Sequence, residues 1–421
     1  MSNNDFKGFE DIKPLEEVLL DYFYSFVKID TTSDPDSSSY PSTEAQNLFA
    51  EVLAGHCSTL GLSDVSVDKY GYVFATLPSN LGDNTSSNNI PTIGFVAHMD
   101  TSPDYSGKGV QPNIIECYDG NDINLKNNTV ISPSEFKSLN NYVGKKLITA
   151  DGTTLLGADD KAGIAEIFTA FKFLLDNPEL KHGDIRLAFT PDEEIGEGTK
   201  YFDVEKFNCD FAYTLDGGGI GELNYENFNA SGAKINITGK NVHPGSAKNI
   251  MVNSSMVANE LISMLPSEMP SNTEKREGFF HLTHINGNIE KTNLGFIIRT
   301  FDEQEFQDKN DLLKNIVKYL NNKYNNCIEL DLNDSYYNMY NILKDNMHIV
   351  EKAQKSMEKA DVEPRIVASR GGTDGACLTY KGLPCPNIFT GGHNYHGPYE
   401  YVCVESMLKA VEVVVNIALD I

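Results

Sequence analysis

The chain has 421 residues, 40% of them hydrophobic, and a formal net charge of −26. This length exceeds one ordinary hydrophobic core, so we expect two domains. The acidic balance repels phosphate backbones and excludes nucleic acid as an expected partner. The N-terminus has no basic or apolar signal region, and no apolar run reaches the ~20 residues of a membrane helix. Seven dispersed cysteines without a CxxC pair fit a reducing compartment, so we predict a cytoplasmic protein without a membrane partner.

Helices and strands are predicted in alternation along most of the chain. Apolar residues at helical spacing predict helices over 14–27, 42–60 and 161–175. Short apolar runs predict strands over 71–77, 92–97, 184–189, 211–215 and 386–389. The polar stretches 79–89 and 119–128 are predicted as surface loops. Such alternation is typical of an α/β fold with a mainly parallel sheet.

The segment from residue 230 to about 333 follows another order. Strands are predicted over 233–238, 279–283, 295–301 and 327–332, with helices over 253–265 and 304–323. The order β-α-β-β-α-β is the ferredoxin-like, split βαβ arrangement. We therefore predict a discontinuous main domain, residues 1–227 and 334–421, that carries an inserted α+β domain, residues 228–333.

Acidic residues and a histidine follow directly after the predicted strands. His98 follows one strand, Glu193 and Glu194 follow the next, and Asp216 follows the third. Ligands of open parallel sheets gather at these carboxyl ends of the strands. Because three consecutive acids at 192–194 repel one another after a buried strand, a bound cation is one way to balance them.

Two further motifs bring carboxylates close to this edge. In His98-Met99-Asp100 the alternation of an extended chain puts both polar side chains on one face, so Asp100 could orient the histidine. A surface loop is the alternative for this short motif. Asp159 opens a predicted helix, where it could either cap free N–H groups or bridge two cations. A late histidine, His396, lies in the glycine-rich segment 390–398.

Taken in order, these motifs resemble the tripeptide aminopeptidases of the M20 metallopeptidase family. The resemblance runs from about residue 20 to the C-terminus and rests on segments 98–100, 157–163, 191–194, 216–219, 241–245, 370–375 and 394–397. It implies a di-metal catalytic domain with a lid formed by the insert. It also implies that His98 and Asp216 bind one zinc ion, that Glu194 and His396 bind the other, and that Asp159 bridges them with a cis peptide bond to Asp160.

The implied ligand set, two zinc ions per subunit, can be checked against zinc chemistry. Each ion receives two ligands of its own, the shared Asp159 and a bridging water, which gives the four positions that zinc prefers. Three ligating carboxylates and one hydroxide offset the four positive charges. The resemblance further implies that Glu193 is the general base and that Asp100 orients His98. Sites of this type also accept Mn²⁺ or Co²⁺, so the native metal stays open.

Residues outside the metal set are candidates for substrate contact. The resemblance implies that His243 stabilises the tetrahedral oxyanion. Arg299 and Arg370 carry guanidinium forks that suit a peptide's terminal carboxylate, and an ion pair with a nearby acid is the alternative for each. Asn253 is a weaker candidate for the same task.

The resemblance implies hydrolysis of the N-terminal residue from tripeptides with a free N-terminus. A dipeptidase or an N-acyl amino acid deacylase of the same family is the alternative function. A catalytically inactive binding protein would be expected to lack a ligand or the base, and this sequence lacks neither. Pairing of exposed strand edges in the insert would give a homodimer, and the sequence leaves the oligomeric state open.

Overall fold

The computed structural model describes residues 8–421 except 10–11 and 83–89, and the chain divides into two compact units. Unit 1 contains Met1–Tyr225, Asn341–Val367 and Thr373–Ile421, and unit 2 contains Glu226–Tyr340 and Ala368–Gly372. Unit 2 is therefore larger than the predicted insert of 228–333. It extends to residue 340 and also includes a short later segment that contains Arg370.

An eight-stranded mixed sheet forms the centre of unit 1, in the order β1-β2-β8-β3-β9-β16-β10-β15. Its strands are β1 Ser63–Val67, β2 Val73–Leu77, β3 Ile93–His98, β8 Ile185–Thr190, β9 Phe211–Gly217, β10 Glu222–Asn224, β15 Arg365–Ile366 and β16 Asn387–Phe389. The four central strands β8, β3, β9 and β16 run parallel, whereas β1 and β2 are antiparallel to their neighbours. The predicted α/β fold with parallel strands at its centre is confirmed.

Helices cover this sheet because its central strands are apolar on both faces. The helices of unit 1 are α1 Ile12–Val27, α2 Glu44–Leu60, α3 Ala158–Asp176, α4 Val204–Phe207, α8 Met347–Lys359, α9 Asp374–Tyr380 and α10 Val404–Leu419, and α7 Tyr340–Leu343 starts at the last residue of the first segment of unit 2. Every residue of β3 is buried. Phe95 belongs to the core that includes residues of α1, α3 and α10, whereas Val96 belongs to a smaller core with Phe207 and Leu378. Alternate side chains of one strand therefore fill the cores on opposite faces.

Smaller elements lie within the same unit. Two further sheets are formed by β17 Gly392–His393, β18 Tyr401–Cys403, β7 Leu147–Thr149 and β4 Asn113–Ile115, and by β5 Ile123–Asn124 and β6 Val130–Ile131. The stretch 119–128, predicted as a loop, therefore contains the short strand β5 and a 3₁₀ turn at Lys126–Asn128. Part of the other predicted loop, 79–89, lies outside the described residues. None of the helices in the described ranges is both long enough and apolar enough to span a membrane.

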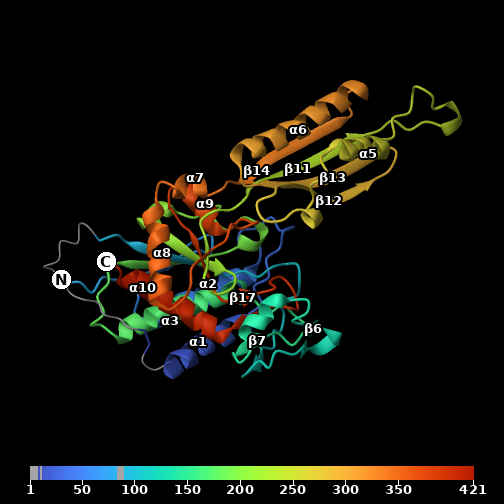
Figure 1. Cartoon of the computed structure of the whole chain (residues 1–421). Coiled ribbons are helices and arrows are strands. Elements are labelled where there is room, and N and C mark those ends of the chain that lie inside the picture. The colour runs from blue at the N-terminus through green and yellow to red at the C-terminus, as the bar shows by residue number, and fades with distance from the viewer. Residues whose placement is uncertain (1–7, 10–11, 83–89) are drawn as a thin grey trace. The chain divides into compact units, whose positions relative to one another are not determined.

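Unit 2 has the order β11 Asn229–Thr238, α5 Ser254–Met264, β12 Phe279–Gly287, β13 Lys291–Thr300, α6 Glu303–Lys323 and β14 Ile328–Tyr336. Its four antiparallel strands lie in the order β12-β13-β11-β14 (Figure 1). In β11 the buried Ile235 and Ile237 alternate with exposed residues, because only one face of the strand points into the core shared with α5 and α6. The predicted ferredoxin-like arrangement of this segment is confirmed.

Candidate metal centre

The parallel register of unit 1 places the ends of three neighbouring strands at one edge of the sheet. His98, the last residue of β3, is opposite Thr190, the last residue of β8. The 3₁₀ turn Glu193–Ile195 follows β8, and Asp216 lies near the end of β9, which pairs with the other side of β3. The residues predicted from strand ends therefore meet at the same edge.

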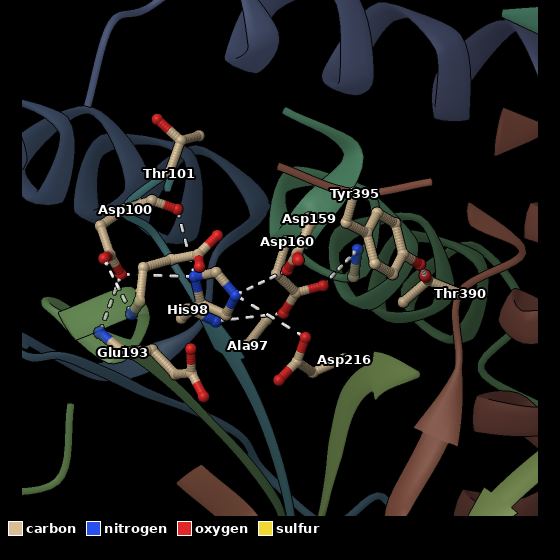
Figure 2. A network of polar contacts seen from close by, with 12 residues as sticks. Ala97, His98, Asp100, Thr101, Asp159, Asp160, Glu193, Asp216, Thr390 and Tyr395 are labelled. Atoms are coloured by element: carbon tan, nitrogen blue, oxygen red, sulfur yellow. Dashed lines mark hydrogen bonds and ion pairs between the residues drawn. The ribbon is translucent and has the colours of Figure 1, made fainter. Parts of the chain in front are cut away.

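His98 is 2% exposed and has carboxylates on both sides of its ring (Figure 2). Its Nε2 lies 2.9 Å from Asp159 Oδ1 and 3.7 Å from Asp216 Oδ1. Its Nδ1 faces Asp100, at 3.3 Å from Oδ1 and 3.1 Å from the backbone oxygen. A histidine held through one nitrogen presents the other in a fixed direction, which is the usual arrangement of a metal-binding histidine.

Asp159 connects this histidine to a second one. Its Oδ1 lies next to His98, whereas its Oδ2 lies 3.3 Å from His396 Nε2. The same His396 nitrogen lies 2.9 Å from Glu194 Oε2. The peptide bond between Asp159 and Asp160 is cis, as the family resemblance implied. The two oxygens of Asp159 thus point to two separate groups of nitrogen and oxygen atoms, as a bridging carboxylate requires.

Two buried carboxylates fix the turn that carries Glu193 and Glu194. The N–H of Glu193 donates to Asp100 Oδ1 (3.0 Å), and the N–H of Glu194 donates to Asp100 Oδ2 (3.2 Å). Asp192, at φ 56°, turns its side chain the other way, where it accepts from the Ser42 N–H (2.7 Å) and Gln46 Nε2 (2.7 Å). Asp100 therefore has a second task, since it holds this turn as well as His98.

Asp104 and Glu400 are among the acidic residues near the centre that the sequence analysis missed. Asp104 Oδ2 lies 3.5 Å from His396 Nδ1, on the side of the ring that faces away from Asp159. Glu400 is buried and accepts from the N–H groups of Leu156 (2.7 Å), Gly157 (2.9 Å) and Asp159 (3.1 Å). No motif marks either residue, because each reaches the centre through a loop whose path is set by tertiary structure. A search for acids within six residues of the motif histidines would have found both, because Asp104 follows His98 and Glu400 follows His396 in the sequence.

Crowding of the buried carboxylates changes their protonation in the protein without a cation. Burial, together with the Asp159 carboxylate, raises the pKa of Asp216 to about 6 and that of Glu194 to about 8, although the neighbouring histidines offset part of the shift. Burial and Asp216 also raise the pKa of Glu193 well above its usual value. Burial would lower the pKa of His98, but hydrogen bonds to Asp100 and Asp159 raise it overall. A bound cation would relieve this crowding and favour the ionised carboxylates.

The donor set fits divalent metal ions. Nitrogen and oxygen atoms of His98, Asp159 and Glu194 all lie within 4.8 Å of one another, and so do those of His98, Glu193 and Asp216. The second group contains Glu193, which the sequence analysis had reserved for proton transfer. Glu194 Oε1 is buried and has no hydrogen-bond partner among the described residues, so one acceptor is left for a cation. Imidazole and carboxylate donors without thiolate suit zinc, manganese or cobalt.

The predicted substrate-binding residues belong to unit 2. His243 is exposed, and its Nδ1 accepts from the Gly245 N–H (3.1 Å). Asn253 caps α5 by accepting from the N–H groups of Ser255 and Met256. The Arg370 guanidinium donates to the backbone oxygens of Lys275 and Glu277 and to Thr273 Oγ1. These contacts give Asn253 and Arg370 structural tasks, and their part in substrate binding stays a prediction.

Arg299 differs from Arg370. Its guanidinium lies over the Tyr336 ring, 4.7 Å from the centroid, and its buried Nη1 has no hydrogen-bond partner within the described ranges. Burial lowers its pKa to about 10, which leaves the side chain charged at neutral pH. No acid in the described part of the chain forms an ion pair with Arg299, so the alternative of a structural ion pair is not supported.

Histidine and carboxylate pairs joined by a shared aspartate, at the carboxyl edge of a parallel sheet, define a candidate dinuclear metallohydrolase. The profile of peptidase family M20/M25/M40 matches residues 149–420. The chain belongs to this peptidase family and is a hydrolase that acts on peptides.

Relatives of known name agree with this membership. Peptidase T of Halothermothrix orenii is 56% identical over 403 residues, which cover 95% of this chain and 98% of the relative. Peptidase T of Bacillus subtilis is 51% identical over 408 residues, with 96% and 98% of the two chains covered. The crystal structure of aminopeptidase PepT from Bacillus cereus is similar with a TM-score of 0.75 and 25% identity, and covers 96% of this chain and 98% of that one.

Proposed function

We propose that this protein is a cytoplasmic tripeptide aminopeptidase that uses two Zn²⁺ ions, one held by His98, Asp159 and Asp216 and the other by Asp159, Glu194 and His396. The observation that carries the proposal is the position of Asp159, whose two oxygens lie 2.9 Å and 3.3 Å from nitrogens of two different histidines. The names of the peptidase T relatives support the peptide substrate.

Zinc ions bound here would lower the pKa of a shared water and stabilise the negative charge that develops on the peptide carbonyl. Glu193 takes the proton of the attacking water and passes it to the leaving amine. Its backbone is held by Asp100, so its carboxylate has a fixed starting point for this transfer. A general base needs such placement within hydrogen-bond reach of the water.

The remaining residues position these groups or bind the ends of the peptide. Asp100 orients His98, and Glu400 fixes the loop that delivers Asp159. Of the two arginines, Arg299 is the better partner for the peptide's C-terminal carboxylate, because Arg370 already donates to backbone oxygens. His243 is proposed to stabilise the oxyanion, as the family resemblance implies, and Asn253 stays the weakest substrate candidate.

A substrate panel tests this function. We expect Ala-Ala-Ala to be cleaved only when the protein holds zinc, with alanine released from the N-terminus. Di-alanine and N-acetyl-alanine are expected to be hydrolysed at least tenfold more slowly, since each lacks one end or one residue of the proposed substrate. Rates measured after chelation and after zinc is added back provide the control. Preferred hydrolysis of the dipeptide or of the acetylated amino acid would support the alternative function instead.

A further inference from the structure

An aromatic pocket lies directly beside His396 in unit 1. It has a volume of about 390 Å³ and is lined by Tyr105, Phe136, Tyr395, His396, Pro398 and Tyr399, among others. This volume lies near the lower end of the roughly 300–1,000 Å³ range of ligand pockets, so the pocket has room for a large amino-acid side chain. None of the interactions of the metal centre described above involves Phe136 or Tyr399.

The walls of the pocket are apolar and only partly covered. The rings of Phe136 and Tyr399 lie 5.3 Å apart at an angle of 38°, and Tyr399 is 40% exposed. Two polar groups of the lining already have partners: Asn394 Nδ2 donates to the backbone oxygen of Tyr399 (3.2 Å), and the hydroxyl of Tyr395, which Figure 2 labels, donates to the backbone oxygen of Gly217 (2.9 Å). An apolar side chain that entered here would leave water without displacing a protein hydrogen bond.

His396 connects the pocket with the metal centre. One edge of its ring carries the nitrogen that lies next to Asp159 and Glu194, and the residue also lines the pocket. On its other nitrogen lies Asp104, a carboxylate that is 73% exposed and directly precedes Tyr105 in the chain. An exposed carboxylate beside an apolar pocket complements an α-ammonium group beside an apolar side chain.

We propose that this pocket binds the side chain of the substrate's N-terminal residue, and that it selects large apolar side chains such as leucine, methionine and phenylalanine. The proposal rests on the function proposed above, because the metal centre must receive the first peptide carbonyl. The α-ammonium group of the same residue then lies at Asp104. Glycine and aspartate at this position gain no apolar contact, and aspartate also meets the charge of Asp104.

Two measurements test the pocket with zinc-loaded full-length protein. We expect kcat/KM for Leu-Ala-Ala to exceed that for Gly-Ala-Ala by at least about tenfold, as is usual when a pocket discriminates by apolar volume. The variants Phe136→Ala and Tyr399→Ala are expected to reduce this ratio at least fivefold, whereas Phe136→Leu, which keeps an apolar wall, retains most of it. Val143→Ala removes an apolar side chain that is 56% exposed outside the pocket and serves as control.

Binding of L-leucinamide and of glycinamide, measured by calorimetry, tests the pocket independently of peptide hydrolysis. We expect leucinamide to bind at least about tenfold more tightly, and the difference to shrink in Phe136→Ala. Equal binding of the two amides, or a difference that survives both alanine variants, would overturn the pocket even if tripeptides are cleaved. Protein that cleaves no tripeptide, yet shows the leucinamide preference and loses it in the variants, would overturn the proposed function and leave the pocket standing.

Discussion

At the scale of single residues, the candidate metal centre depends on which atom of each histidine and carboxylate faces which neighbour. Asp159 divides its oxygens between His98 and His396, and each of these histidines has a second carboxylate, Asp100 or Asp104, on its Nδ1 side. Such second carboxylates fix the ring and raise the basicity of the nitrogen that binds a metal. The sequence indicated Asp100 through its spacing from His98, but it had no corresponding signal for Asp104.

The role of Glu193 can be tested without disturbing the ligands. Glu193→Gln keeps the shape of the side chain and removes its ability to accept a proton, so we expect kcat to fall by about 10²–10⁴-fold. The zinc content is expected to stay at the wild-type value. Glu197→Gln provides a matched control, since Glu197 is a partly exposed acid four residues further on that pairs with Lys200. A fully active Glu193→Gln enzyme would show that the base lies elsewhere.

At the scale of elements, the strands that carry each motif could be predicted from the sequence, but the distant residues that hydrogen-bond to the motif could not. Strands over 92–97, 184–189 and 211–215 were expected from short apolar runs, and the structure has them at Ile93–His98, Ile185–Thr190 and Phe211–Gly217. The helix over residues 42–60 was also expected, but its link to the turn after β8 was not. Gln46 on this helix binds Asp192, 146 residues away, and no local pattern predicts such a pair.

The contact between α2 and this turn leads to a prediction for Gln46→Ala. Gln46 donates to the buried Asp192 carboxylate (2.7 Å) and accepts from the Asp192 N–H (3.0 Å). The hydrogen bond to the carboxylate group contributes roughly 1.5–3 kcal/mol, so we expect the free energy of unfolding to fall by at least about that amount. The kcat for tripeptides should fall as well, because the turn carries Glu193. Urea unfolding and steady-state kinetics measure the two effects.

Leu48→Ala on the same helix is the control, since Leu48 is exposed and surface substitutions usually change stability by less than about 0.5 kcal/mol. If Gln46→Ala matched Leu48→Ala in both stability and kcat, the two hydrogen bonds between Gln46 and Asp192 would have no energetic role.

At the scale of the whole molecule, the two units differ in how far the sequence could describe them. In the insert, β11 pairs with the distant strands β13 and β14, and the sheet could be predicted because the element order β-α-β-β-α-β matches the ferredoxin-like arrangement. Unit 1 is built from segments far apart in the chain: its sheet places β16, formed by Asn387–Phe389, next to β9 and so brings the loop with His396 near the other ligands. The pairing of distant strands depends on packing across the whole core, which no local pattern states.

The net charge of the whole molecule also favours the binding of cations. A net charge of −26 gives the protein a strongly negative surface, and the centre adds further carboxylates whose mutual repulsion a bound cation would relieve. Metal binding should therefore stabilise the folded chain as well as enable catalysis, because ligands that bind only the native state raise its stability.

The most direct test of the paired centre is the number of zinc ions bound per chain. Protein saturated with Zn²⁺ and dialysed against metal-free buffer would be analysed by inductively coupled plasma mass spectrometry, with protein concentration from amino-acid analysis. We predict two zinc ions per chain for the wild-type protein, because Asp159 offers one oxygen to each of two histidine–carboxylate groups. A value of one zinc ion or none would contradict a centre bridged by Asp159.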